Sequence, residues 1–333
     1  MKKAIRISLI LIIFIGCFII LNMLLQPKYA TSLVEGSMIA QYYDESKDHE
    51  VIFIGDCELY ANFSPMVMYE SAGIKAYVRG SSQQMIWQSY YILKETLKYE
   101  KPKIVIFNIN SIRYDKQSEE VSEAYNRLTI DQMKWSQEKI DIINASMTEE
   151  ETFLSYVFPI LRYHSRYDKL TSEDFEYLFK KKHNTHNGFL INKHIKGVNN
   201  LPTPKKLGNY EFNKESLNYL ELILKLCEEN DIKLILVKAP SLYPHWYEEY
   251  EQQVIAFAEE NNVAYYNFIK YSEEIGIDYT TDTYDGGLHL NLSGATKLSK
   301  FFANILKSNY DLTNYQGDPI YEEKLKIYKN AIK

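Results

Sequence analysis

Residues 51–58 of this 333-residue chain read Val51-Ile52-Phe53-Ile54-Gly55-Asp56-Cys57-Glu58. The run is apolar and rich in β-forming residues, and it stops at a Gly-Asp-Cys turn that precedes a segment able to form a helix. These features predict a buried parallel strand. Because the carboxyl ends of parallel strands form the edge at which α/β proteins bind ligands, the stretch also predicts that Cys57 is presented there as a nucleophile.

Further apolar segments predict the other strands, at residues 76–80, 103–110, 233–237 and 264–268. Between and after them, apolar residues at helical spacing predict helices at 66–71, 86–98, 216–230, 247–261 and 294–309. This alternation predicts an α/β fold, a three-layer α/β/α sandwich around a doubly wound parallel sheet of five strands.

The alternation is interrupted between residues 111 and 207, where the chain is charged, rich in tyrosine and helical in character. A strand-free block of this length predicts an inserted cap over the catalytic edge of the sheet. The expected organisation is therefore a cytoplasmic tip and membrane anchor at 1–28, a tether with a first helix at 29–47, the first part of the sheet domain at 48–110, the insertion at 111–207, and the second part at 208–333.

The N-terminus carries Lys2, Lys3 and Arg6, followed by a nearly unbroken apolar run over residues 7–25. Its length, about 19 residues, favours a membrane-spanning helix over the shorter core of a cleaved signal peptide. The best cleavage candidate, around residues 30–32, is poor, so we expect an uncleaved signal anchor. The positive charges predict a single-pass protein with a cytoplasmic N-terminus and an extracytoplasmic catalytic domain. A lipoprotein processing box ending at Cys17 is the alternative, but no polar tether follows that residue.

Composition and cysteine and histidine spacing argue against some classes of partner and cofactor. The net charge of −6 gives no basic footprint, so nucleic acid is not an expected partner. Cys227 falls on the apolar face of a predicted helix and is expected to be a core residue. His183 and His186 lack companions at metal-ligand spacing, so neither a metal nor another cofactor is predicted.

A candidate base lies near the other end of the chain. His289 stands in the loop before the last predicted helix, with Asp285 and Asp282 close by. All strand carboxyl ends of a parallel sheet open on one edge, so this loop can meet Cys57. We expect Cys57 to attack an acyl carbonyl, His289 to take its proton, and Asp285, or in reserve Asp282, to orient the imidazole. The sequence leaves open whether the surroundings lower or raise the pKa of the thiol.

Stabilising the oxyanion requires donors that are fixed in advance. Gly80, at the end of the second strand, can bring its backbone N–H close because it lacks a side chain. Asn108 and Asn110 share one side of the third strand and could each offer an amide donor. Within the insertion, Arg162, His164 and Arg166 form a weaker candidate for binding an anionic or glycan substrate.

Taken together, the Gly55-Asp56-Cys57 turn, Gly80, the Asn108 and Asn110 pair and the His289 loop resemble the four conserved blocks of the SGNH (GDSL-like) hydrolase superfamily, with Cys57 in the place of serine. With the anchor, the insertion and the Asp285-to-Ala295 phrase, the chain is similar to extracytoplasmic acyl-transfer proteins, such as the D-alanyl transfer protein of lipoteichoic acid assembly and the alginate-type O-acetyltransferases. The resemblance implies a membrane-bound O-acyltransferase as partner and a cell-wall polysaccharide or teichoic-acid-like polymer as substrate.

The leading hypothesis is an esterase or O-acyltransferase that acts on acyl esters of a cell-envelope polymer through Cys57, His289 and Asp285. A non-catalytic SGNH-fold protein that binds a glycan or an acyltransferase is the first alternative. A thioesterase or lipase with a soluble substrate is the second.

Overall fold

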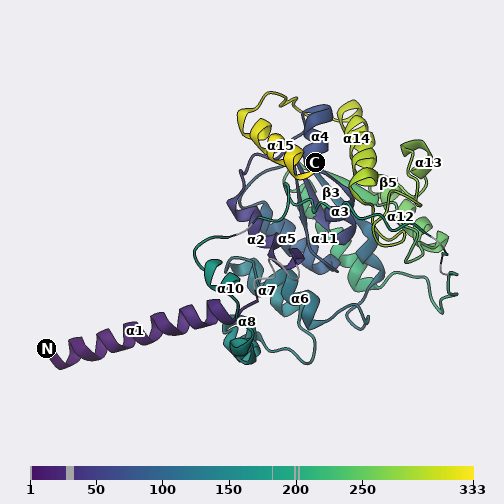
Figure 1. The fold of residues 1–333 in the computed structure, drawn as a ribbon. Helices are drawn as coiled ribbons and strands as arrows, with labels where there is room; N and C mark the ends of the chain where they lie inside the picture. The colour runs from purple at the N-terminus through teal and green to yellow at the C-terminus, as the bar shows by residue number, and fades with distance from the viewer. Residues whose placement is uncertain (1, 28–33, 182, 199, 202) are drawn as a thin grey trace.

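A computed structural model describes residues 2–27, 34–181, 183–198, 200–201 and 203–333, and Figure 1 shows its fold. Residues 30–32, where the cleavage candidate lies, fall outside the described residues, as does part of the predicted tether. The strands are β1 (Val51–Gly55), β2 (Ala76–Gly80), β3 (Ile104–Asn108), β4 (Lys233–Lys238) and β5 (Ala264–Asn267). All five are parallel and lie in the order β2-β1-β3-β4-β5. The predicted parallel α/β sheet is therefore confirmed.

Helices cover both faces of the sheet because alternate residues of each strand are apolar and buried. Val51 and Phe53 of β1 point into one core, and Ile52 and Ile54 into the other. The helices outside the insertion are α1 (Lys2–Leu25), α2 (Met38–Gln41), α3 (Cys57–Asn62), α4 (Pro65–Ala72), α5 (Ile86–Thr96), α11 (Lys214–Glu228), α12 (Glu248–Glu260), α13 (Ser272–Ile275), α14 (Leu292–Asn309) and α15 (Pro319–Ala331). The core of Val51 and Phe53 lies under α4, α14 and α15, and the core of Ile52 and Ile54 under α5 and α11.

Local sequence signals set where these helices begin. The Asp56 carboxylate caps α3 by accepting a hydrogen bond from the backbone N–H of Glu58 at 3.0 Å. Helix α4 begins at Pro65 after the capping residue Ser64. Asn291 caps α14 in the same way. Each cap fixes the turn that joins a strand or loop to its helix.

The insertion contains α6 (Glu123–Ile130), α7 (Gln137–Ser146), α8 (Phe153–Val157), α9 (Ile160–Tyr163) and α10 (Ser172–Glu176). Short 3-10 helices precede and interrupt it: η1 (Val34–Ser37), η2 (Tyr42–Asp44), η3 (Ile109–Arg113) and η4 (His164–Asp168). Helix α7 packs against α5, so this helical part covers one flank of the sheet domain. The amides and hydroxyls that join it to α5 are buried, as in the bond from Gln88 to Asn126 at 2.9 Å.

The last part of the insertion, residues 186–198, is an extended segment that we call the strap. It pairs with the sheet edge where Asn187 O accepts a hydrogen bond from Val78 N at 3.0 Å. It then passes α3, where Leu190 N donates to Tyr60 O at 2.9 Å. Further on, Lys196 N donates to Thr283 O at 2.9 Å. The strap therefore runs along the catalytic edge. Helix α6 of the insertion also reaches this edge, since the Thr129 hydroxyl hydrogen-bonds that of Ser81, directly after β2, at 2.5 Å.

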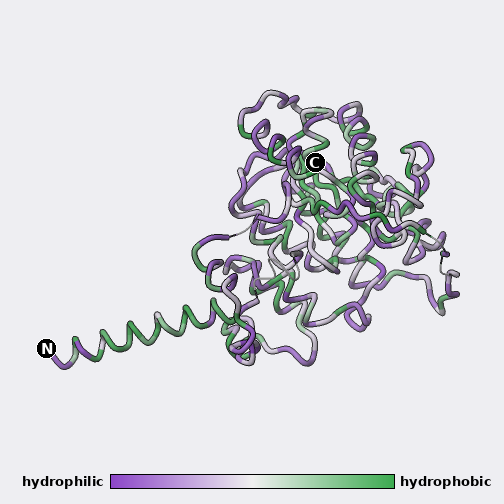
Figure 2. The backbone as a smooth tube through the Cα atoms, viewed as in Figure 1, coloured by the Kyte–Doolittle hydropathy of each residue, from purple (hydrophilic) through white to green (hydrophobic). Residues whose placement is uncertain are grey.

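Helix α1 extends away from the body and is hydrophobic along almost its whole length (Figures 1 and 2). It is long and apolar enough to cross a membrane, which suits a single-pass anchor and also a signal sequence. Residues 38–42 of the predicted tether are buried, so the chain joins the domain core well before β1.

Candidate active site

The candidate site lies where the order of the strands in the sheet reverses. The chain leaves β1, forms β2 on one side of it, and then returns to form β3 on the other side. In doubly wound sheets the loops diverge at such a point and leave a crevice at the carboxyl ends of the strands. Cys57 follows β1 as the first residue of α3 and is half-buried in this crevice. The structure thus places Cys57 where a small ligand can reach it.

His289 and Asp285 form a tight pair beside it. Asp285 Oδ2 accepts a hydrogen bond from His289 Nδ1 at 2.7 Å, and Asp285 Oδ1 accepts one from the backbone N–H of His289 at 2.8 Å. The spacing of four residues allows one carboxylate to hold both groups. The ring of Tyr284 stacks on the imidazole, with 5.6 Å between ring centroids. The second ring nitrogen, Nε2, is buried without a hydrogen-bond partner among the described residues.

The interaction of His289 with Cys57 shows in the pKa values of both groups. Burial raises the pKa of the Cys57 thiol above its ordinary value, and the neighbouring His289 opposes this rise. Burial alone would lower the pKa of His289, but the charge of the Cys57 thiolate and the hydrogen bond to Asp285 raise it well above its ordinary value. Each group therefore shifts the pKa of the other, so the thiol and the imidazole lie close together.

Helix α3 also holds the histidine loop in place. Asn62, at the end of α3, accepts a hydrogen bond from the backbone N–H of Leu290 at 2.7 Å. From the other side, the Tyr243 hydroxyl donates to the carbonyl of Asp285 at 2.6 Å. The nucleophile and the base are thus fixed by the same short helix. Sequence analysis missed both Asn62 and Tyr243, since neither lies in a motif.

The reserve aspartate has different partners. Asp282 Oδ2 pairs with Lys297 Nζ at 2.6 Å and accepts a hydrogen bond from the backbone N–H of Asp278 at 2.9 Å. No contact joins Asp282 to the imidazole, whereas Asp285 binds it directly. Of the two candidates, the structure therefore brings Asp285 to His289.

Asn108 and Asn110 both reach the turn that carries Cys57. Asn108 Nδ2 donates to Asp56 Oδ1 at 2.8 Å and to Glu58 Oε2 at 3.2 Å, so both of its amide protons are used. Asn110 Nδ2 donates to Asp56 Oδ2 at 2.7 Å and retains one proton. Asn110 is also slightly exposed, whereas Asn108 is completely buried. Of these two asparagines, Asn110 is therefore the one with an amide proton left for an oxyanion.

Gly80 lies directly across from Gly55 in the paired strands. A Cβ atom at Gly80 would stand 3.0 Å from Gly55 O and 3.3 Å from Asp56 O. The absence of a side chain therefore lets β2 approach the backbone of the nucleophile turn closely.

A buried ion pair lies beneath this turn. Lys238 Nζ, at the end of β4, binds Glu58 Oε1 at 2.5 Å and the Ser241 hydroxyl at 2.8 Å. Lys238 and Glu58 are almost inaccessible to solvent. Burial and the nearby Glu58 charge raise the pKa of Asp56. Sequence analysis did not single out Lys238, because a lysine ending a strand usually points to solvent.

The candidate substrate residues of the insertion lie elsewhere. Arg162 pairs with Glu123 at 2.7 Å, and Arg166 donates to Leu25 O and pairs with Asp174. His164 is exposed on the surface. These residues lie at the end of α1, and the structure does not bring them to Cys57.

A cleft of about 610 Å³ opens between η3 and the loop after β4. Its lining includes Arg113, Tyr114, Tyr243, His245 and Tyr247. Tyr243, in this lining, donates to the carbonyl of Asp285 at 2.6 Å. The cleft therefore adjoins the loop that carries His289.

The described residues contain no group of three or more His, Cys, Asp or Glu side chains that could hold a metal ion. All three cysteines are free, and Cys227 is buried in the core as predicted. The arrangement can thus supply a nucleophile, a base with its orienting carboxylate, and amide donors.

No protein-family model matches the chain, and no curated protein matches it. The solved structures that resemble it include two from Bacteroides species. One is a candidate acylhydrolase from Bacteroides fragilis, 12% identical, with a TM-score of 0.39 over 81% of this chain and 94% of the other. The second is a GDSL-like lipase from Bacteroides thetaiotaomicron, 11% identical, with a TM-score of 0.38 over 82% of this chain and 98% of the other. A function for this chain therefore has to be argued from the geometry of its site.

Proposed function

We propose that the protein is a membrane-anchored esterase or O-acyltransferase that carries an acyl group on Cys57. The observation that supports this most is the hydrogen bond between Asp285 and His289, which leaves His289 Nε2 without a partner among the described residues, beside a thiol whose pKa His289 lowers and whose charge raises the pKa of His289.

The proposed reaction has two halves. Cys57 Sγ attacks the carbonyl carbon of an acyl ester while its proton passes to His289 Nε2, and the tetrahedral intermediate collapses to a thioester as His289 returns the proton to the leaving alcohol. An acceptor hydroxyl, or water, then gives its proton to His289 and attacks the thioester, which frees Cys57. Asp285 stays ionised throughout and stabilises the imidazolium.

The developing oxyanion needs hydrogen bonds that the resting site does not use. Asn110 is the proposed side-chain donor, because one of its amide protons is uncommitted. The backbone N–H of Gly80 is the proposed second donor, because Gly80 lies close to the turn. Asn108 holds Asp56 and Glu58 in place.

The proposed substrate is an acyl ester of a cell-envelope polymer. Helix α1 would hold the domain at the membrane, and the cleft beside the His289 loop presents tyrosine rings and Arg113 to a ligand. Aromatic rings pack against the apolar faces of sugars, and arginine binds carboxylate or phosphate groups. A membrane-bound O-acyltransferase is the proposed source of the acyl group.

One observation favours a second function, a binding protein without catalysis. Burial raises the pKa of Cys57, so the resting thiol is largely protonated and a weak nucleophile unless His289 acts as its base. A site that has lost its activity would keep the same fold and the same cleft.

Intact-mass spectrometry of the full-length protein with an activated acetyl ester separates the two functions. We expect a single acetyl adduct on the parent protein and none on Cys57→Ala. Cys227→Ala is the matched control and should acquire the adduct as the parent does. If Cys57 is alkylated by iodoacetamide but never acetylated, the catalytic proposal fails and the binding protein replaces it.

A further inference from the structure

The insertion carries an unusual surface beside the end of α1. Large apolar side chains that are exposed to solvent gather on its helices and loops: Trp135, Leu154, Phe158, Leu161, Phe175 and Phe179. Soluble surfaces rarely expose so many large apolar side chains together, and such patches mark contact with a partner or a membrane. We call this set the foot. In Figure 1, α8 and α10 lie where α1 leaves the body.

Specific contacts fix the position of the foot along the axis of α1. Asn22 Oδ1 accepts a hydrogen bond from Ile160 N at 3.0 Å. The ring of Phe158 packs against Phe18, with 5.9 Å between centroids. Phe18 lies seven residues before Leu25, the last residue of α1, which is about 10 Å along a helix axis. If α1 spans a bilayer, Phe158 therefore lies below the level at which the apolar run ends.

A groove of about 600 Å³ separates α1 from the insertion and strengthens this argument. Ile15, Ile19 and Met23 line one wall. Trp135 and Phe158 line the other, together with the charged residues Asp131 and Lys139. Since the α1 wall belongs to the apolar run, the opposite wall faces the same medium. Lipid chains fit such a surface, whereas water would leave both walls unfavourably hydrated.

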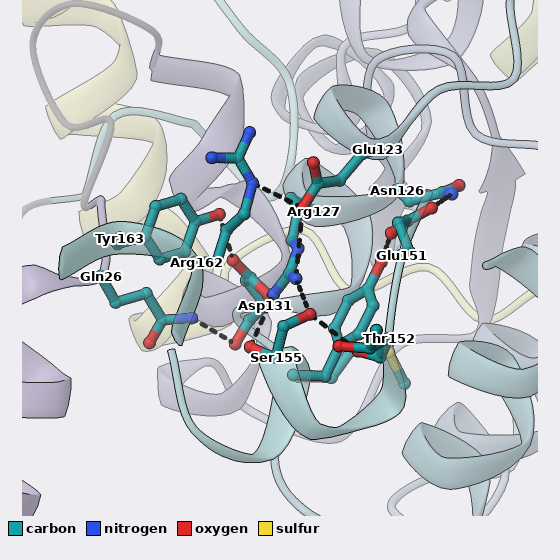
Figure 3. A network of polar contacts seen from close by, with 12 residues as sticks. Gln26, Glu123, Asn126, Arg127, Asp131, Glu151, Thr152, Ser155, Arg162 and Tyr163 are labelled. Atoms are coloured by element: carbon teal, nitrogen blue, oxygen red, sulfur yellow. Dashed lines mark hydrogen bonds and ion pairs between the residues drawn. The ribbon is translucent and has the colours of Figure 1, made fainter. Parts of the chain in front are cut away.

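The polar groups behind the foot are paired with one another (Figure 3). Asp131 binds Arg127 at 3.2 Å and accepts a hydrogen bond from the Tyr163 hydroxyl at 2.9 Å. Its backbone carbonyl accepts a hydrogen bond from Gln26, just beyond α1, at 3.3 Å. Polar groups near hydrocarbon must be satisfied internally. These bonds satisfy the Asp131 side chain and tie the insertion to α1, whereas Arg127 Nε is buried without a hydrogen-bond partner among the described residues.

We propose that the foot is a membrane-seating surface, which dips into the outer boundary of the lipid bilayer around α1. Aromatic and aliphatic side chains at this depth are typical of the interface between hydrocarbon and water. The foot is then a second contact with the membrane besides α1, so the domain cannot rotate freely about a single helix. The catalytic edge is then held in a fixed orientation above the membrane.

Depth-dependent quenching tests the proposal without reference to catalysis. Leu161 in the foot and Ile327 on α15 are matched in exposure, at 55% and 53%. Full-length Leu161→Trp and Ile327→Trp proteins are reconstituted in phosphatidylcholine vesicles with or without brominated acyl chains. We expect brominated lipid to remove at least half of the added fluorescence of Leu161→Trp and to leave that of Ile327→Trp unchanged.

Two results would overturn the proposal. Absence of quenching at both positions would mean that the foot stays out of the lipid and faces a protein. Equal quenching at both positions would mean that the body lies on the membrane without a preferred face. Equal melting temperatures of the two variants and the parent in detergent exclude misfolding as the cause of either result.

Discussion

At the scale of single residues, the proposed mechanism depends on the division of one proton between two side chains. Burial favours the neutral Cys57 thiol, and Asp285 favours the charged imidazole of His289. Once the thiolate forms, its charge raises the pKa of His289 further. Proton transfer is therefore self-reinforcing, because each half of the ion pair stabilises the other inside a poorly solvated crevice.

The Asp285 contact should make stability depend on pH. The pKa of His289 is raised by folding, so its contribution is fully present below pH about 6.5 and is lost as pH rises through the folded pKa. We expect Asp285→Asn to lower the free energy of unfolding by about 1.5–3 kcal/mol at pH 6, because a hydrogen bond to a charged group is lost. The difference from the parent should shrink at higher pH. Urea denaturation over a pH series measures it.

Asp282→Asn is the control for this experiment. Asp282 binds Lys297 and not His289, so its effect should stay constant between pH 6 and pH 8. A pH-dependent effect from Asp282→Asn, with none from Asp285→Asn, would reverse the assignment of the two aspartates.

Asn108 and Asn110 should differ in what they support. Asn110→Ala removes the proposed oxyanion donor and should slow formation of the acetyl adduct by about 10²- to 10³-fold. Asn108→Ala leaves Glu58 Oε2 unsatisfied in the interior and should cost about 1–3 kcal/mol of stability, with a smaller effect on rate. Adduct kinetics and thermal unfolding of both variants give the comparison. A larger rate loss in Asn108→Ala would refute the role given to Asn110.

The sequence predicts that these residues lie near the site, but it does not predict which member of each pair has which role. Strand periodicity puts Asn108 and Asn110 on one side, and both aspartates lie within reach of His289 in sequence. The choice between the members of each pair depends on partners that are distant in sequence, such as Asp56 for the asparagines. Lys238 was missed for the same reason, since its partner Glu58 is 180 residues away.

At the scale of elements, strands with buried faces were predictable and extended surface segments were not. The second strand was predicted at residues 76–80, where the structure has β2, because a central parallel strand reads as an unbroken apolar run. The strap has no such signature. Its position depends on backbone hydrogen bonds to Val78 and Tyr60, which place no demand on residue type.

Gly188 is the point at which the strap depends on its sequence. It has a φ of +83°, and a Cβ atom there would lie 2.0 Å from the carbonyl oxygen of Val78. Gly188→Ala must therefore displace the strap, and we expect a cost of at least about 1–3 kcal/mol and a lower melting temperature. Hydrogen exchange at the Val78 amide, which donates to Asn187, should accelerate.

Gly208→Ala is the matched control, since nothing lies within 4 Å of a Cβ atom at that position. Its melting temperature should equal that of the parent. If Gly188→Ala has the melting temperature of the parent, and its Val78 amide exchanges as slowly as in the parent, the strap does not depend on this close approach.

At the scale of the whole molecule, the C-terminal helix α15 closes the structure. Residues 310–333 were assigned to the second part of the sheet domain, but no helix was predicted after residue 309. In the structure, α15 joins three distant parts of the chain. Lys324 pairs with Glu45, Asp318 pairs with Lys75, and the Tyr321 hydroxyl accepts a hydrogen bond from Asn187 of the strap.

Tyr321 is therefore expected to contribute strongly to the free energy of unfolding, although it lies near the end of the sequence. Its side chain is fully buried and packs near Tyr69, with 5.1 Å between ring centroids. Tyr321→Ala should cost about 3–5 kcal/mol, as is typical of a large aromatic residue removed from a core. Its neighbour Ile320 is 56% exposed, so Ile320→Ala should change stability by less than about 0.5 kcal/mol. Chemical denaturation of both variants measures the contrast. Equal, small losses would mean that α15 contributes little to the stability of the domain. The expected large loss would mean that α15 and the segments that it contacts, around Glu45, Lys75 and the strap, unfold together.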